Sequence, residues 1–204
     1  MRPPRMRVAL FGRSLAGFTL ANAMERAGHE VQMLSDPAEL ASFEALIIAV
    51  GDARLEATVE LLEPHVHHGL IVFHTCLSRG VQVLDPLETR GCVVAALAPF
   101  ALMRWAVTTL DELGETVAEL NITEFRGEAV ALSDAERPSF AARAYYAEML
   151  RRLHISAAVD ARFFPSAEEK PMVGEDMDTE EIIAAYRGAT DPGLRRSYVE
   201  VARR

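Results

Sequence analysis

The stretch that decides the fold is Met6-Arg-Val-Ala-Leu-Phe-Gly-Arg-Ser-Leu-Ala-Gly17. Its apolar run at residues 8–11 stops at Gly12, which predicts a buried strand that ends in a tight turn. From residue 14 to 27 the apolar side chains recur at helical spacing, and Gly28 follows, as glycine commonly does at a helix end. The chain therefore opens with a strand, a glycine turn and a helix.

The same pattern continues through the first hundred residues. Short apolar runs at residues 31–34, 45–50, 70–73 and 93–97 read as four more strands, and helical stretches separate them. Buried strands that alternate with helices favour a parallel sheet covered on both faces, and right-handed crossovers make it doubly wound. We expect an α/β fold: a doubly wound, mostly parallel Rossmann-like sheet with a short helical C-terminal extension.

The second half of the chain has a looser pattern. Its apolar spacing predicts a helix at 105–120, short strands at 122–125, 129–132 and 155–159, and helices at 179–187 and 193–203. Ser133-Asp-Ala-Glu136 offers the cap of a further helix. We therefore expect a Rossmann-like domain over residues 1–160 and a short helical tail over residues 161–204, with dimerisation as one role for the tail.

Composition limits the possible partners and location of this chain of 204 residues. Half of it is hydrophobic, a quarter is charged, and the formal net charge is −9, which suits a packed globular protein and opposes a general attraction to nucleic acid. No apolar run has the length of a membrane span. The only two cysteines, Cys76 and Cys92, suit a reducing compartment. We expect a cytoplasmic protein that binds neither nucleic acid nor membrane.

The turn after the first strand is the candidate nucleotide site. A dinucleotide fold places its pyrophosphate where a strand leads through a glycine turn into a helix, and here Gly12, Arg13, Ser14 and Leu15 occupy that place. Ser14 stands where the G-x-G-x-x-G fingerprint has its middle glycine. Its hydroxyl can donate to a phosphate, and Arg13 can neutralise one. The alternative is that the glycines only shape a turn.

Cofactor choice depends on the end of the second predicted strand, where Ser35 and Asp36 stand. Asp36 lies nineteen residues beyond Gly17, where a carboxylate accepts hydrogen bonds from ribose hydroxyls and repels an additional 2′-phosphate. This favours NAD, and NADP stays possible because Arg13 or Ser35 can weaken the preference. Asp36 can equally serve only as a helix cap.

Three segments carry a family resemblance over about the first hundred residues. They are the opening stretch, Ala27-Gly-His-Glu-Val31 and Ala45-Leu-Ile-Ile-Ala-Val-Gly-Asp52, and together they resemble the N-terminal domain of the 6-phosphogluconate dehydrogenase-like Rossmann superfamily. The resemblance implies that Ala49, Val50 and Gly51 line the cofactor near its ribose and nicotinamide. It also implies that Thr75 borders the nicotinamide and the substrate.

The departures from that family leave two functions open. Lys170 is the only lysine and stands in a loop-like stretch, whereas the hydroxyacid branch has a catalytic lysine on a helix beyond the Rossmann domain. Ala98-Pro99 replaces the His-Pro pair of some relatives. One hypothesis is an NAD(P)-dependent oxidoreductase that transfers hydride to or from a small acidic or imine substrate. The other is a catalytically degenerate protein that binds or senses a dinucleotide. We expect a homodimer, because the tail is too short to enclose a cleft alone.

The remaining candidates are histidines and cysteines. His74 ends the fourth predicted strand at the edge where ligands bind, so it is a candidate acid–base catalyst; a hydrogen-bonded strand-end histidine is the alternative. His65-Val-His-His68 reads as a solvated loop, because no cysteine or carboxylate nearby in sequence completes a metal site, and we expect no metal. Both cysteines read as small buried thiols.

Overall fold

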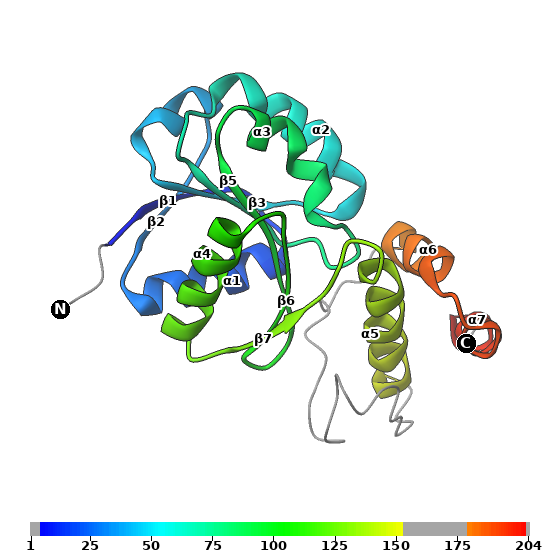
Figure 1. The fold of residues 1–204 in the computed structure, drawn as a ribbon. Coiled ribbons are helices and arrows are strands. Elements are labelled where there is room, and N and C mark those ends of the chain that lie inside the picture. Colours follow the sequence, from blue (N-terminus) through cyan, green and yellow to red (C-terminus); the bar gives the residue numbers. More distant parts are fainter. Residues whose placement is uncertain (1–4, 153–178, 203–204) are drawn as a thin grey trace.

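The computed structural model describes residues 5–152 and 179–202. In these ranges seven strands form one sheet in the order β2-β1-β3-β4-β5-β6-β7 (Figure 1). The strands are β1 (Arg7–Gly12), β2 (Glu30–Met33), β3 (Ala45–Ala49), β4 (Ile71–His74), β5 (Val93–Ala101), β6 (Arg104–Thr109) and β7 (Glu128–Ala131).

The direction of the strands confirms the expected mostly parallel α/β sheet. Strands β1 to β5 are parallel to their neighbours, β6 returns antiparallel to β5, and β7 is parallel to β6. The strand β3 is buried along its whole length, which is why it reads as a continuous apolar run and not as an alternating one.

Helices cover both faces of the sheet. In Figure 1, α2 and α3 lie on one face, and α1 and α4 lie on the other. Each face has its own apolar core, the first built around Ile48 and Leu55 and the second around Ile47 and Met24. The helices are α1 (Leu15–Ala27), η1 (Pro37–Ser42), α2 (Asp52–Leu62), η2 (Glu63–His65), η3 (Val81–Leu84), α3 (Asp85–Thr89), α4 (Glu112–Glu124), α5 (Arg137–Arg152), α6 (Thr179–Gly188) and α7 (Pro192–Ala202).

The last three helices are built on an extension of the sheet. Strand β4 ends at His74, opposite Ala96, but β5 continues to Ala101 and pairs there with the start of β6. A third core joins this extension to α5, α6 and α7, which Figure 1 shows grouped together beside the sheet. Phe100 meets Phe140 of α5 edge-on at 4.9 Å between ring centroids. The helical extension at the C-terminal end is therefore present, and it rests directly on the sheet.

Two expectations for the second half were wrong. Residues 105–109 belong to strand β6 and not to a helix, and the helix α4 begins only after Asp111, whose side chain accepts a hydrogen bond from the N–H of Gly114 at 2.7 Å. Residues 122–124 close α4 and do not form a strand. The expected strand at 155–159 lies outside the described residues.

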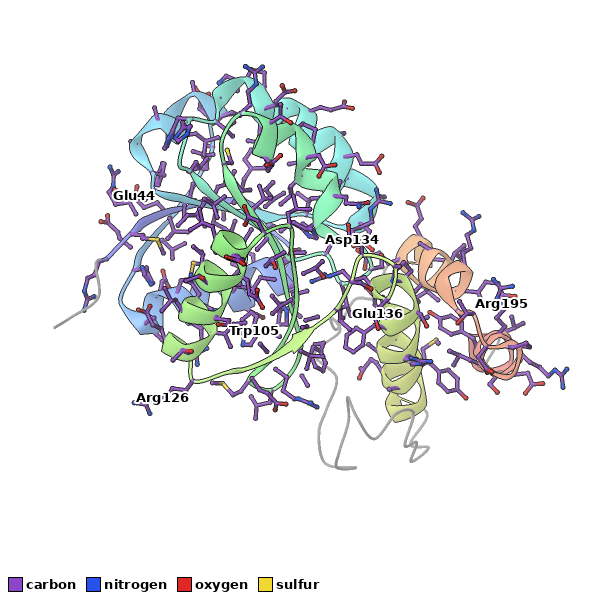
Figure 2. All side chains as sticks on the ribbon, in the orientation of Figure 1. Glu44, Trp105, Arg126, Asp134, Glu136 and Arg195 are labelled. Carbon is purple, nitrogen blue, oxygen red and sulfur yellow. The ribbon has the colours of Figure 1, made fainter. Side chains whose placement is uncertain are left out.

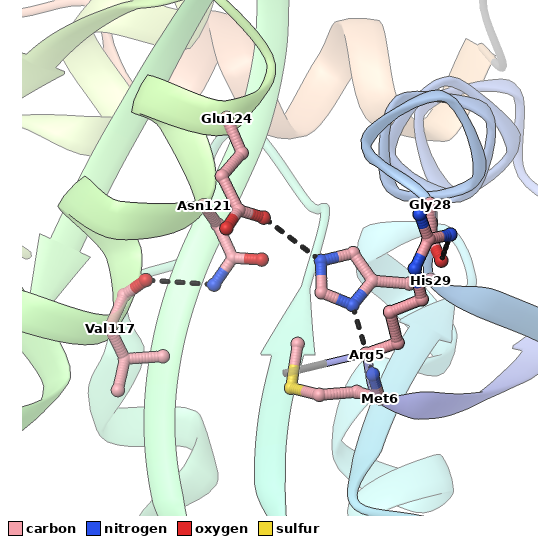
Figure 3. Close-up of polar contacts among 7 residues, drawn as sticks. All are labelled: Arg5, Met6, Gly28, His29, Val117, Asn121 and Glu124. Atoms are coloured by element: carbon pink, nitrogen blue, oxygen red, sulfur yellow. Dashed lines mark hydrogen bonds and ion pairs between the residues drawn. The ribbon is translucent and has the colours of Figure 1, made fainter. Parts of the chain in front are cut away.

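Two buried side chains mark the contacts of α4. Trp105 lies where α4 packs on the sheet, and His29 lies where α4 meets the turn after α1. Trp105, the only tryptophan of the chain, is 4% exposed, packs against Phe125 at 5.4 Å, and has no hydrogen-bond partner for its Nε1 among the described residues. His29 accepts the N–H of Met6 on Nδ1 and contacts Glu124 through Nε2 at 3.1 Å (Figure 3). These contacts join α4 to the beginning of β1.

Membrane association through a spanning helix has no support within residues 5–152 and 179–202. None of the helices there has both the length and the apolar character that crossing a bilayer requires.

Candidate functional site

The candidate site lies at the reversal of strand order in the sheet. The chain passes from β1 outward to β2 and then to β3 on the other side of β1. In open α/β sheets, ligands bind beyond the carboxyl ends of the strands at such a switch point. The loops that leave β2, β1, β3 and β4 lie side by side along this edge. These loops and the residues that flank them contain all the residues that the sequence proposed for the cofactor.

Two glycines allow α1 to start close to β3. Gly12 has φ +103°, a conformation that residues with a side chain rarely adopt. A Cβ on Gly12 would also lie 2.7 Å from the carbonyl carbon of Ala49, and one on Gly17 would lie 2.8 Å from its Cα. The close approach of helix and strand that the fingerprint requires is therefore built into this turn.

Ser14 organises the start of α1. It is the N-cap residue, and its Oγ accepts the N–H of Gly17 at 3.1 Å while its own N–H donates to the carbonyl of Ala49 at 2.9 Å. Ser14 Oγ also lies 3.5 Å from Thr75 Oγ1. Among the described residues, the N–H groups of Leu15 and Ala16 have no acceptor, so the helix start still presents two backbone donors to an anion. Arg13 and Leu15 are exposed beside them.

At the end of β2, Asp36 performs the role that the sequence gave as an alternative. Its Oδ1 accepts the N–H of Ala38 at 2.9 Å and caps η1. Ser35 and Asp36 are both exposed, and a carboxylate has further acceptor positions beyond the one used by the cap. Capping therefore leaves Asp36 able to accept from a ribose.

Beyond β3 the tail reaches the site. Ala49 and Val50 are buried, and Gly51 is the N-cap of α2 without a side-chain cap. A Cβ on Gly51 would lie 2.8 Å from Oε1 of Glu181 in α6, so the absent side chain makes room for a carboxylate. Tyr145 of α5 donates its hydroxyl to Oε2 of the same glutamate at 3.4 Å.

The loop after β4 contains the two remaining candidates, Thr75 and His74, and both are buried. Nε2 of His74 lies 3.0 Å from the carbonyl of Gly80, and Nδ1 accepts the N–H of Cys76 at 3.2 Å. Burial, with the nearby Arg137 charge, lowers the pKa of His74 to about 3. Both ring nitrogens are thus used within the loop, which matches the alternative of a hydrogen-bonded strand-end histidine.

The other reactive groups behave as structural parts. Cys76 and Cys92 are free and buried, and burial raises the pKa of both thiols, to about 11 for Cys92. His67 lies 3.0 Å from the carbonyl of Phe43 through its Nε2. Within the described part of the chain no cluster of histidine, cysteine and carboxylate side chains could hold a metal.

Four residues at this edge were not singled out as functional residues from the sequence. Asp134 precedes α5, and its carboxylate accepts the N–H groups of Val81 and Gln82 at 2.8 and 3.1 Å. The others are Arg137, Tyr145 and Glu181, on helices α5 and α6. Their contacts at this edge join residues more than thirty positions apart in sequence, so no local sequence pattern could identify these residues as functional.

A comparison with known families supports the fold. Residues 33–99 match the family model of the Rossmann-like domain. No curated protein sequence matches the chain.

Solved structures add distant likenesses of the same kind. The chain superimposes on 3-hydroxyisobutyrate dehydrogenase of Mycobacterium tuberculosis with a TM-score of 0.63 and 11% identity, over 98% of this chain and 94% of that one. Arogenate dehydrogenase of Synechocystis gives 0.58 and 13%, over 97% and 87%. Pyrroline carboxylate reductase of Plasmodium falciparum, solved with NADP bound, gives 0.57 and 11%, over 74% and 66%. The chain therefore has the Rossmann-like fold, and the expected resemblance is confirmed at that level.

Proposed function

We propose that this chain binds a nicotinamide dinucleotide, with NAD preferred over NADP, at the carboxyl edge between β1 and β3. The observation that carries the proposal is the turn after β1, where Gly12 allows α1 to start against β3 and the N–H groups of Leu15 and Ala16 have no acceptor among the described residues. Such a helix start stabilises a diphosphate. Pyrroline carboxylate reductase, a distant fold relative solved with NADP bound, supports a nicotinamide dinucleotide as the class of ligand.

Each residue of the site has a stated role in this proposal. Leu15 and Ala16 donate backbone N–H groups to the diphosphate, Ser14 supplies its hydroxyl, and Arg13 adds a positive charge. Asp36 accepts from the adenine ribose while it caps η1, with Ser35 beside it. The backbone of Ala49, Val50 and Gly51, together with the Thr75 loop, borders the nicotinamide half. When bound, the dinucleotide supplies hydride-transfer chemistry.

On this basis we propose an NAD(P)-dependent oxidoreductase of a small imine or acidic substrate, active as a homodimer. A dinucleotide-binding protein without catalysis is the second candidate, and one observation favours it. His74, the expected acid–base residue, uses both ring nitrogens within its own loop. Turnover assays that follow NADH oxidation with a panel of imines and 2-oxo acids separate the two candidates.

The first prediction tests the role of Asp36 in cofactor choice. Asp36→Arg removes the ribose acceptor and the repulsion of a 2′-phosphate, so we expect the ratio of NADH to NADPH affinity to fall at least tenfold, about 1.4 kcal/mol. Calorimetric titration of both nucleotides measures this ratio. Asp36→Asn, which retains an oxygen for the η1 cap, should lower the ratio in the same direction by a smaller factor.

The control for that prediction is Glu39→Arg, which makes the same charge change on an exposed residue of η1. It should leave the ratio of the two affinities within twofold of the wild-type value. If Asp36→Arg lowers the affinities for NADH and NADPH by the same factor, Asp36 does not contact the adenine ribose. Absence of heat with all four nicotinamide dinucleotides would end the proposed function.

A further inference from the structure

Arg137, the first residue of α5, is fully buried and has an acceptor for every N–H of its guanidinium. The group is surrounded by oxygens from the β4 loop, from β5 and from β6. Nε donates to the hydroxyl of Thr108 at 2.7 Å, Nη1 to the carbonyls of Cys76 at 2.9 Å and Leu77 at 3.4 Å, and Nη2 to those of Ala96 at 2.8 Å and Ala106 at 2.9 Å.

All of these acceptors are uncharged. No carboxylate among the described residues forms an ion pair with Arg137, although Asp134 and Asp52 are near enough to act on it electrostatically. Burial lowers its pKa to about 10, so the group stays charged at neutral pH. Burying a charge without a contacting counter-ion is costly, and apolar side chains often fill such a space at no loss of stability. The stability of the fold therefore does not by itself explain why an arginine, and not an apolar residue, occupies this position.

The loop that Arg137 holds is the one that connects the parts of the candidate site. Thr75 lies 3.5 Å from Ser14, the cap of α1, and the thiol of Cys76 donates to the carbonyl of Val50 at 3.2 Å. Ser78 donates its hydroxyl to Asp52, the first residue of α2. The guanidinium holds the carbonyls of this same short segment, and so α5 fixes the place from which these contacts are made.

The segment before Arg137 holds the far end of the loop. Asp134 accepts the N–H groups of Val81 and Gln82, and the Glu136 carboxylate accepts both the N–H and the hydroxyl of Ser133 in the turn that leads into α5. Figure 2 shows Asp134 and Glu136 at the junction between the sheet and α5. Asp134 and Arg137, three residues apart, thus hold the two ends of the loop after β4.

We propose that Arg137 is a positioning residue of the dinucleotide site, which fixes the Thr75–Cys76–Leu77 backbone and thereby sets the affinity for the nicotinamide half of the cofactor. The inference rests on the proposed function. The adenine half depends on the α1 start and on Asp36, and Arg137 forms no hydrogen bond with either. Loss of the guanidinium should therefore weaken ligands that carry nicotinamide and spare those that end at the diphosphate.

The experiment compares NADH with ADP, which carries the adenosine and the diphosphate and lacks the nicotinamide half. Dissociation constants are measured by calorimetry for the wild-type chain and for Arg137→Met and Arg137→Lys. We expect Arg137→Met to raise the dissociation constant of NADH at least tenfold and that of ADP at most twofold. Arg137→Lys keeps a charge but loses the planar set of donors, so its dissociation constant for NADH should lie between those of the wild type and Arg137→Met.

Two further variants separate positioning from stability. Arg79→Met removes a partly exposed arginine of the same loop, paired with Glu56, and should leave the NADH to ADP affinity ratio unchanged. Thr75→Val leaves Arg137 in place and removes the hydroxyl 3.5 Å from Ser14, so it tests separately whether the Thr75 loop contributes to NADH binding. If Arg137→Met fails to fold, Arg137→Lys carries the test of the guanidinium.

The outcomes distinguish the two proposals. An Arg137→Met protein that loses affinity for NADH and for ADP equally, or for neither, overturns the positioning role while the dinucleotide site stands. A wild-type chain that binds neither ligand overturns the site, and the role of Arg137 falls with it.

Discussion

The turn after β1 and the loop after β4 lie at the same edge of the sheet, but the first is fixed by local contacts and the second by residues distant in sequence. The turn after β1 is fixed by its own residues and one neighbouring strand, because Ser14 caps Gly17 three positions later and both glycines fit against Ala49. The loop after β4 is held by Arg137 and Asp134, 61 and 53 residues away in sequence. The first is a local structure, whereas the second exists only once α5 has packed.

This difference separates two kinds of sensitivity. A local turn responds to changes in backbone conformation and close contacts, and it should be indifferent to charges elsewhere. A loop held by a buried guanidinium and a buried imidazole should respond to protonation and to the packing of α5. The three predictions that follow test this contrast, from the largest expected effect to the smallest.

Acid should destabilise the fold through the loop after β4. The pKa of His74 is about 3 in the folded chain and near 6.5 when unfolded, so only the unfolded chain takes up a proton between these values. The stability is present above pH 6.5 and is lost as the pH falls, by about 3 kcal/mol between pH 7 and pH 4. Urea unfolding at pH 7, 6, 5 and 4 measures this loss.

The matched variant is His74→Gln, which cannot take up the proton. It should be less stable at pH 7 and should show a shallower loss toward pH 4 than the wild type. Amide exchange at pH 5 should accelerate in residues 75–80 before it does in residues 12–17. Parallel pH profiles for the two proteins would show that His74 does not cause the acid sensitivity.

Glycine substitutions should separate the two constraints on the turn after β1. Gly69 has φ +83° with open space around it, Gly17 has a close contact without a positive φ, and Gly12 has both. We expect alanine to lower the free energy of unfolding by about 1 kcal/mol at Gly69, about 2 kcal/mol at Gly17, and about 3 kcal/mol at Gly12 where the terms add. If Gly12→Ala lowers the free energy of unfolding no more than Gly69→Ala does, Ala49 must move to make room for the new Cβ.

The smallest effect should come from the cap of α1. Ser14→Ala removes the acceptor for the Gly17 N–H and should cost about 1 kcal/mol, whereas Ser14→Gly should cost only a few tenths. Thermal unfolding of the two variants side by side measures the difference. Equal losses would indicate that the contact with Thr75, and not the cap, stabilises this residue.

The sequence predicted what is local. The strand end at Gly12, the helix end at Gly28 and the pairing of Ser133 with Glu136 ahead of α5 are present, because each depends on a few adjacent residues. The expected helix over 105–120 was wrong because the helical spacing of α4 was extended backward through a β-branched and aromatic run. Asp111 is the cap that separates the two, so the signal was present in the chain.

The support of the loop after β4 could not be predicted in this way. Nothing in the residues around Arg137 shows that its acceptors are four carbonyls and a hydroxyl from β5, β6 and a distant loop. Glu181 likewise meets Gly51 only through the packing of α6. Such contacts depend on how the elements pack, which residue patterns do not specify.

The buried indole of Trp105 makes the protein its own optical probe. It is the only tryptophan and lies in an apolar setting beneath α4, so its emission should be blue-shifted in the folded chain and move to longer wavelength on unfolding. Because Trp105 lies outside the proposed cofactor contacts, a decrease in its fluorescence upon addition of NADH would reflect resonance energy transfer to the dihydronicotinamide. One native chromophore can thus follow denaturation and ligand titration without any label.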